Sequence, residues 1–420
     1  MKGVARTVIP PVSLFLASFL ICAIFTRIAD PIPVQNDAAE YFRLAENVAA
    51  GKGISLDGAN PYPYRAPLFP SLLGGWFFAT GQPTVLSARI YQSVCIALSV
   101  VFSYFLALTL FGNRRTAVVI ASILACHPSL VTFTAFVLQE PTLLLFTTLT
   151  VWLTLRWLRS GGVRAAVVAG TSWGVATLGK FVTVFLPLIP FFFLLFPGKR
   201  GNRISSREAL WACAAFLLVL APWTVRNYHC FHRFILVNDQ GLGMLEWNVR
   251  HADPPDSGEE GLASSLLGIF RYGPGERNKP AGERFVEELD AQGVRGEARR
   301  NRMAGYVIDH WRYFLAQRSW NAMYFAVPST EWFIHSGKVR TVRDNVPVLL
   351  LMLLQLPFYL FFGARVWGLL RGVDPGYEIS YLVLFFLCYW GTYAMLVGEP
   401  RFSLPVYPVL IALAPWEKWA

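Results

Sequence analysis

Apolar runs long enough to cross a lipid bilayer recur along most of this chain, and they constrain its fold more than any other feature. Hydrophobic residues make up 55% of the sequence and charged residues 15%, and the mean hydropathy is +0.44. A helix needs about 20 apolar residues to span a hydrocarbon core, and a spanning chain must satisfy its backbone polar groups internally. We therefore expect an all-α polytopic membrane protein rather than a soluble domain.

The apolar runs predict about ten spans when they are read in windows of about 20 residues. The first run follows Lys2 and Arg6, and no small-residue cleavage site precedes Asp30-Pro31, so we interpret it as a retained signal anchor. The predicted spans are, in order, 8–28, 85–111, 117–136, 141–158, 164–180, 181–197, 209–225, 346–366, 378–397 and 402–416.

The short loops between these spans carry their positive charge at one end, which predicts the orientation in the membrane. The basic residues concerned are Lys2, Arg6, Arg114, Arg115, Arg156, Arg159, Arg164, Lys199, Arg200, Arg203, Arg207, Arg365 and Arg371. By the positive-inside rule this end is cytoplasmic, so we expect a multi-pass protein of the inner (plasma) membrane. Much of the formal net charge of +11 is then cytoplasmic loop charge, and no nucleic-acid partner is expected.

This topology leaves three outward-facing segments: a first loop at 29–84, a short turn from Cys126 to Glu140, and a long segment at 226–345. Only the last is long enough to form a small domain, and we expect it to be mainly helical. No strong internal repeat is visible, which weakens the case for a transporter built from inverted halves. The predicted organisation is an N-terminal transmembrane module at 1–225, an extracytoplasmic segment at 226–345 and C-terminal transmembrane helices at 346–420.

An acidic cluster in the first outward loop, Asp37-Ala-Ala-Glu40, has two interpretations. Asp at a helix N-cap with Glu three residues later is a capping box, and an apolar stripe through Tyr41 and Leu44 continues the helix. From the spacing alone, capping is favoured over catalysis. We expect this helix to lie in the membrane interface with its stripe facing lipid.

Glu140 is the only acid between Asp57 and Glu208, and the topology puts it on the same face as Asp37. It precedes Pro141, so one interpretation is that it flanks a helix start, where negative charge suits the helix dipole. The other is that two acids converge at one membrane surface. They would then serve as base and partner, or share a divalent metal ion.

Four cations are expected on the same face: Lys180, Arg65, Arg226 and Arg401. Each of them taken alone is explained by snorkelling to lipid headgroups. Taken together, they are better explained as a site for a lipid-borne phosphate, because fixed cations at a membrane surface suit that anion.

Several motifs occur in a fixed order along the chain. They are Asp37-x-x-x-Tyr41, Arg65-Ala-Pro67-Leu-Phe-Pro70, His127-Pro128, Glu140-Pro141, Gly174-Val-Ala-Thr-Leu-Gly-Lys180, Ala221-Pro-Trp-Thr-Val-Arg226-Asn-Tyr228 and Glu399-Pro-Arg401-Phe-Ser-Leu-Pro405-Val-Tyr-Pro408. This ordered set resembles the GT-C superfamily of integral-membrane glycosyltransferases. The resemblance is to the bacterial members related to protein O-mannosyltransferases and lipid A aminoarabinose transferases, the glycosyltransferase family 39-like group.

The resemblance implies a GT-C arrangement of helices and a role for each of the two acids. Asp37 corresponds to the first-loop Asp that acts as general base, and Glu140 to an acid that supports it or helps to hold a metal ion. The family often has a second acid directly beside the first-loop Asp, whereas here that neighbour is Asn36. A divalent metal ion is thus a possible cofactor, with Asp37 and Glu140 as its ligands.

The resemblance also implies a donor and a reaction. Lys180 and Arg401 would bind the phosphate of a polyprenyl-phosphate sugar, with Arg226 and Arg65 as further candidates. The expected reaction moves a single sugar, with inversion, to a glycolipid, polysaccharide or protein acceptor on the extracytoplasmic side. Two alternatives stay open: a ligase that transfers a whole glycan from a polyprenyl diphosphate, and a non-enzymatic transporter or flippase of lipid-linked sugars.

Overall fold

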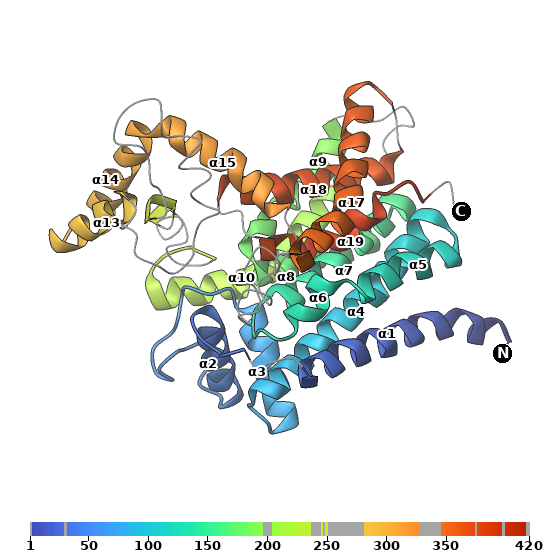
Figure 1. The fold of residues 1–420 in the computed structure, drawn as a ribbon, viewed down its shortest axis with the longest axis horizontal. Coiled ribbons are helices and arrows are strands. Elements are labelled where there is room, and N and C mark those ends of the chain that lie inside the picture. The colour runs from blue at the N-terminus through green and yellow to red at the C-terminus, as the bar shows by residue number, and fades with distance from the viewer. Residues whose placement is uncertain are drawn as a thin grey trace. The chain divides into compact units, whose positions relative to one another are not determined.

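The computed structural model describes residues 2–28, 32–195, 204–236, 245–246, 248–250, 281–326, 346–373, 376–396 and 400–416. The regular secondary structure in these ranges is helical, and no β-strand occurs among them (Figure 1). The predicted all-α fold is therefore confirmed. Some residues used in the sequence analysis lie outside the described ranges: Asp30, Pro31, Lys199, Arg200, Arg203 and Glu399.

Six helices of the described chain are long and apolar enough to cross a membrane. They are α1 (Lys2–Ile28), α4 (Val85–Phe111), α7 (Glu140–Ser160), α10 (Ser206–Phe231), α17 (Val346–Leu370) and α18 (Tyr377–Met395). In α1 and α17 the apolar windows are Pro10–Ile28 and Leu353–Leu370. These helices bear out a multi-pass membrane protein, while the number of ten spans stays a prediction.

Proline divides three of the predicted spans into shorter pieces. The span expected at 117–136 consists of α5 (Arg114–Ala125) and α6 (Pro128–Phe133), with Pro128 at the first position of α6. Proline cannot donate the backbone hydrogen bond that would continue a helix, and it forces the residue before it out of the helical region. The span at 181–197 likewise becomes η1 (Phe181–Phe185) and α9 (Leu188–Leu195), and the span at 402–416 becomes η4 (Pro400–Val406) and α19 (Tyr407–Ala412).

Helix α8 (Val163–Gly179) packs closely on α10, and two glycines make this contact possible. A Cβ atom at Gly170 would collide with the backbone of Ala212, and one at Gly174 would collide with Val219. Small residues four apart let two helix backbones approach, a common arrangement in membranes. This contact fixes the position of α8, whose last residue, Gly179, is followed by Lys180.

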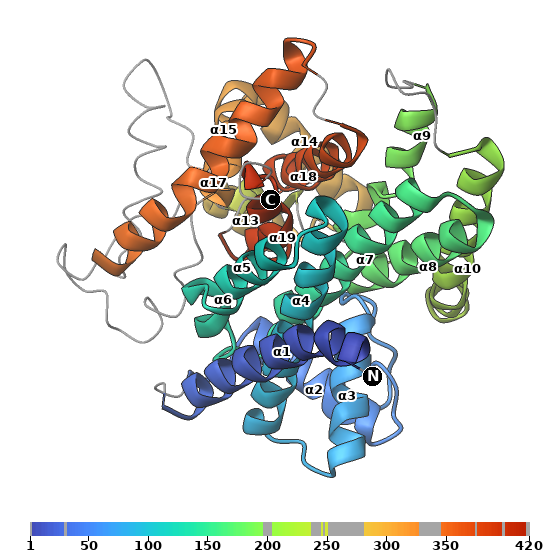
Figure 2. The same cartoon turned by 90° about the vertical axis from the view of Figure 1, so that its right-hand side faces the viewer.

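Helices α2 (Asp37–Ala49) and α3 (Leu68–Thr80) form a hairpin-like pair and lie side by side in both views (Figures 1 and 2). The apolar stripe of α2 packs on α3 and is buried there. The ring of Tyr41 meets that of Phe69 edge-on at 5.1 Å, and Val48 lies over Gly74, which leaves no room for a Cβ atom. The expectation that this stripe faces lipid is therefore wrong, because α3 provides an apolar partner within the chain.

The chain divides into two compact units, each described by itself. Unit 1 comprises Met1–Val237, Pro328–Tyr389 and Pro400–Ala420, and unit 2 comprises Asn238–Val327 and Trp390–Glu399. In unit 1, α4 contacts α1, α5 and α7, and α7 in turn contacts α8 and η4. The sequence-based division at 225 and 345 stays a prediction.

Unit 2 contains α13 (Ala281–Ala291), α14 (Gly296–Asp309) and α15 (Trp311–Phe325). Its small core is made of Val286, Leu289, Met303, Tyr313 and Phe314, joined by Val249. The buried Arg299 guanidinium bonds to Asp290 at 2.8 Å and to Glu246 at 3.1 Å. A buried cation needs such partners, so this network holds α13 and α14 in register.

Candidate active site

Asp37 is the first residue of α2, and its carboxylate does not cap the helix. The N-cap residue is Asn36, whose side chain makes no capping hydrogen bond, while its carbonyl accepts from the backbone N–H of Glu40 at 3.2 Å. The predicted capping box is therefore wrong. Asn36 has φ 53° and ψ −129°, a region that costs a non-glycine residue about 1–3 kcal/mol and often marks a functional site.

The guanidinium of Arg65 joins the two acids at the start of α2. Arg65 Nη2 donates to Asp37 Oδ1 at 2.6 Å, and Arg65 Nε donates to Glu40 Oε2 at 2.7 Å. The guanidinium also lies over the Tyr41 ring, 5.1 Å from its centroid. Glu40 was expected only to complete the helix cap, but its carboxylate instead accepts a hydrogen bond from Arg65. Residues three apart on a helix share a face, so the spacing of the two acids already allowed this arrangement.

A second guanidinium reaches the other carboxylate oxygen of Asp37. Arg401 belongs to η4, and its Nη2 lies 3.5 Å from Asp37 Oδ2. Asp37 is thus bonded by one arginine on each oxygen: Arg65 lies 28 positions away in the sequence and Arg401 lies 364 positions away.

The charges around Asp37 keep it ionised. Burial raises the pKa of this carboxyl, but the positive charges of Arg65, Arg401 and Lys180 lower it by more, and the pKa lies below its ordinary value of 3.8. Opposite charge within a few ångströms favours the charged form. At neutral pH Asp37 is therefore a carboxylate, able to accept a proton.

Glu140 and Lys180 form a second, more deeply buried pair. Glu140 begins α7, Lys180 follows the last residue of α8, and Lys180 Nζ lies 3.8 Å from Glu140 Oε1. The Glu140 side chain is 3% exposed and the Lys180 side chain is 11% exposed. The other oxygen, Glu140 Oε2, has no hydrogen-bond partner among the described atoms. A buried carboxylate oxygen without a partner is costly, so this atom is a candidate for a ligand contact.

The ring of Phe402 connects the two charge clusters. Lys180 Nζ lies 3.8 Å from the centroid of this ring, and Arg401 Cζ lies 5.1 Å from it. Cations over an aromatic face are stabilised by its quadrupole, and this contact also keeps them in place. No role for Phe402 was predicted from the sequence, although its position directly after Arg401 was a signal.

Five of the six predicted site residues come together in this way: Asp37, Glu140, Lys180, Arg401 and Arg65. The contacts found for Arg226 are different. Its guanidinium bonds to Asn227 at 2.8 Å and to the carbonyl of Ile54 at 3.4 Å, and it lies over the Trp223 ring. These contacts tie α10 to the loop that follows α2.

The described residues do not form a protein-built metal site. No three His, Cys, Asp or Glu side chains gather among them. The carboxylates of Asp37 and Glu140 both face cations, which compete with a metal ion for the same oxygens. The divalent metal ion stays a hypothesis, and we derive no step through it.

The all-α fold with its candidate membrane spans is the one expected of a membrane glycosyltransferase of the GT-C type. Residues 65–225 match the family model of dolichyl-phosphate-mannose-protein mannosyltransferases. The matched segment includes Arg65, Glu140 and Lys180. A sequence search among curated proteins finds no match to this chain.

Solved structures with a similar fold include two of oligosaccharyltransferases. The archaeal oligosaccharyltransferase AglB from Archaeoglobus fulgidus, in complex with an inhibitory peptide and a dolichol-phosphate, is 15% identical with a TM-score of 0.55, over 96% of this chain and 50% of that one. The Archaeoglobus fulgidus oligosaccharyltransferase tethered to an acceptor peptide is 16% identical with a TM-score of 0.53, over 96% and 49%. Apo ArnT from Cupriavidus metallidurans is 15% identical with a TM-score of 0.44, over 98% and 77%.

This chain spans about half the length of the two oligosaccharyltransferase chains. At these identities the likeness is one of fold. Together with the family model over residues 65–225, it confirms the predicted resemblance to GT-C superfamily glycosyltransferases.

Proposed function

We propose that this protein transfers a single sugar from a polyprenyl-phosphate donor to an acceptor hydroxyl on the extracytoplasmic side of the inner membrane, with Asp37 as the general base. The observation that carries the proposal is the Asp37 carboxylate bonded by Arg65 and Arg401, in the electrostatic field of Lys180. A carboxylate next to fixed cations suits a reaction that removes a proton at one atom and builds negative charge at another.

In the proposed reaction the acceptor hydroxyl attacks the anomeric carbon of the donor. Asp37 accepts the hydroxyl proton as the new glycosidic bond forms, and the bond between the anomeric carbon and the phosphate oxygen breaks. The departing polyprenyl phosphate keeps the bonding electron pair. One displacement inverts the configuration at the anomeric carbon.

The cations are proposed to hold the donor phosphate and to stabilise the charge that builds on it. Lys180 and Arg401 share the Phe402 ring, which orients both of them. A preorganised contact of this kind is worth about 3 kcal/mol in the transition state. The AglB structure contains a dolichol-phosphate, a lipid phosphate of the class that such cations suit.

Donor binding is proposed to activate the base. The contact of Arg401 with Asp37 is long, 3.5 Å, compared with 2.6 Å for Arg65. A bound phosphate competes for Arg401 and adds negative charge nearby, and both effects raise the pKa of Asp37. Asp37 then becomes a stronger base when the donor is in place.

Arg65 is better described as a positioning residue than as a phosphate ligand. Two of its guanidinium nitrogens already bond to Asp37 and Glu40. The arrangement aims Asp37 and leaves Lys180 and Arg401 as the proposed phosphate ligands. A phosphate role for Arg226 stays a sequence-based prediction.

The test is the Asp37→Asn variant, which keeps the size of the side chain and removes its basicity. We expect transfer of radiolabelled sugar in membranes to fall by about 10²–10⁴-fold, the usual contribution of a positioned general base. Mass spectrometry of membrane glycolipids and envelope glycans identifies the missing sugar and its acceptor. Near-normal transfer by Asp37→Asn, at equal protein level and topology, would contradict the proposal.

The same experiment separates the alternatives. A glycan ligase that uses a polyprenyl diphosphate does not necessarily need a carboxylate base, so its transfer would survive Asp37→Asn. A flippase would move labelled sugar across the bilayer without bonding it to a new acceptor.

A further inference from the structure

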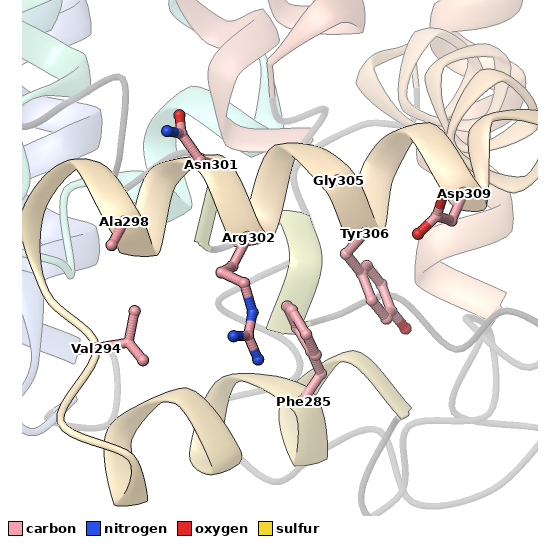
Figure 3. A pocket seen from close by; sticks show the side chains of 8 residues that line it. All are labelled: Phe285, Val294, Ala298, Asn301, Arg302, Gly305, Tyr306 and Asp309. Carbon is pink, nitrogen blue, oxygen red and sulfur yellow. The ribbon is translucent and has the colours of Figure 1, made fainter.

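A groove of ≈ 600 Å³ lies in unit 2. None of its lining residues belongs to the acid–cation cluster, the group formed by Asp37, Glu140, Lys180, Arg401 and Arg65. Its walls come from α13, from α14 and from the turn between them, and the residues that matter here are Phe285, Val294, Arg302, Gly305, Tyr306 and Asp309 (Figure 3). This volume is within the range of about 300–1,000 Å³ that small-molecule sites occupy.

Aromatic rings form the apolar part of the groove. The Phe285 ring extends from α13 toward α14, and the Tyr306 ring extends from α14 toward α13 (Figure 3). The two rings stack with centroids 4.6 Å apart and an angle of 20° between their planes. Both pack on the core of unit 2, so the pair is a fixed surface rather than a flexible one.

A glycine at position 305 leaves the α14 side of this groove without a side chain at that point. Gly305 lies inside α14, where glycine costs about 1 kcal/mol relative to alanine. A Cβ atom at this position would meet no described atom within 4 Å. Packing within the described chain therefore does not require a glycine here, and a larger side chain would extend into the open groove.

The charged groups of the groove balance one another. The Arg302 guanidinium points from α14 into the space beside Phe285, and Asp309 lies at the end of α14 (Figure 3). Arg302 supplies hydrogen-bond donors and Asp309 supplies acceptors. A phosphate ligand would be repelled by Asp309 and a basic peptide by Arg302. A ligand without charge but with many hydroxyl groups can use both.

We propose that this groove binds a neutral oligosaccharide, whose apolar faces pack on the side of the stacked Phe285–Tyr306 pair that lines the groove and whose hydroxyls bond to Arg302 and Asp309. The further step, that this oligosaccharide is the glycan part of the acceptor, rests on the proposed transferase function. Apolar sugar faces pack on aromatic rings through dispersion and weak C–H contacts. The proposal narrows the acceptor from glycolipid, polysaccharide or protein to a molecule that carries a neutral glycan.

Direct binding to the purified full-length protein in nanodiscs tests the proposal. The probes are a panel of neutral hexasaccharides (glucans, mannans and N-acetylglucosamine oligomers) and the neutral oligosaccharides released from membranes of Asp37→Asn cells, where unmodified acceptor accumulates. We expect the wild type to bind at least one probe. Gly305→Leu, which fills the groove, and Arg302→Ala should each weaken this binding by about tenfold or more.

Arg300→Ala is the matched control. Arg300 is exposed on the same helix and pairs with Glu297 at 3.6 Å, so its removal changes the net charge as Arg302→Ala does, without touching the groove. Binding by Arg300→Ala should equal that of the wild type. The melting temperature of Gly305→Leu should be no lower than that of the wild type, because no described atom lies within 4 Å of the new Cβ atom.

Several results would overturn the proposal. These are wild-type binding to none of the probes, equal binding by Gly305→Leu and Arg302→Ala, or binding of charged peptides or lipid headgroups in place of neutral glycans. The two proposals fail separately. If transfer depends on Asp37 but no glycan binds, the proposed transferase function is retained and the proposed glycan site is rejected. If glycan binds but transfer does not depend on Asp37, the glycan site is retained and the proposed role of Asp37 is rejected.

Discussion

At the scale of single residues, the site depends on how charges are paired rather than on how many there are. Arg65 bonds to Asp37 and Glu40 at once, and Arg401 makes a longer contact with the second oxygen of Asp37. Arg65 therefore holds the Asp37 carboxylate firmly, whereas an incoming anion can more easily replace Asp37 as the partner of Arg401. This difference gives two predictions.

The first prediction concerns Glu40→Gln. Removing this charge loosens Arg65, so Asp37 loses its fixed orientation. We expect kcat to fall by about tenfold, equivalent to about 1.4 kcal/mol, with the KM for donor changed less than about twofold. Steady-state kinetics in nanodiscs measure both quantities.

Glu46→Gln is the control for that variant, because Glu46 lies on the same helix and pairs with the exposed Arg43 at 3.3 Å. Its kinetics should match those of the wild type. A large rise in donor KM in Glu40→Gln, with kcat unchanged, would mean that Arg65 binds phosphate instead of positioning the base.

The second prediction is a difference between two pH profiles. The acid limb of kcat/KM reports the free enzyme, in which Arg65 and Arg401 hold the pKa of Asp37 below 3.8. The acid limb of kcat reports the donor complex, where the bound phosphate raises that pKa. Activity is lost as pH falls and Asp37 is protonated, so the limb of kcat should lie at higher pH than the limb of kcat/KM. Coincident limbs would exclude the proposed activation by the donor.

At the scale of elements, residues of the proposed site lie at the ends of helices, and packing elsewhere along the helices sets where those ends lie. Glu140 begins α7 and Lys180 follows α8, and both helices contact each other along their length. The contact of α8 with α10 at Gly170 and Gly174 lies in the middle of α8 and toward its C-terminal end, so it sets the position of the helix end that leads to Lys180.

Gly170→Ala tests this element. The new Cβ atom would collide with the backbone of Ala212, which cannot rotate away, so we expect a loss of about 1–3 kcal/mol of stability. Gly75→Ala in α3 is the control, since no described atom lies within 4 Å of its Cβ position and alanine favours a helix. Thermal unfolding in detergent compares them. Equal melting temperatures for the two variants would show that the α8–α10 contact has room for a Cβ atom at position 170.

At the scale of the whole molecule, the orientation in the membrane decides which compartment the site faces. The positive-inside rule predicts that the loop after α2 is extracytoplasmic and that the loop after α7 is cytoplasmic. Ala59 in the loop after α2 and Ser160, the last residue of α7, are both exposed, so both positions can be labelled.

Single-cysteine labelling of intact cells measures the orientation. The exposed Cys126 and Cys230 are first replaced by serine, and Ala59→Cys or Ser160→Cys is then introduced. A membrane-impermeant maleimide should modify Ala59→Cys from outside and should reach Ser160→Cys only after permeabilisation. The reverse pattern would place the acid–cation cluster in the cytoplasm and rule out an extracytoplasmic acceptor.

Hydropathy and charge by themselves predicted the membrane class, the all-α fold and the extents of α4 and α7, because long apolar runs have few alternatives in a bilayer. The helices predicted near Pro128 and Pro408 were too long. Hydropathy windows count only apolar composition and do not include the limits that proline places on a helical backbone. Ordered motifs also singled out the residues that form the acid–cation cluster.

Only the tertiary structure decided how those residues are used. Local spacing made Asp37 and Glu40 a capping box, whereas the fold turns both toward Arg65 and brings Arg401 to Asp37 from the far end of the chain. The same local stripe that predicted a lipid-facing α2 is buried on α3. A periodic pattern defines which face of a helix is apolar or charged. The element that packs on that face comes from a distant part of the sequence, so only the folded chain shows which element it is.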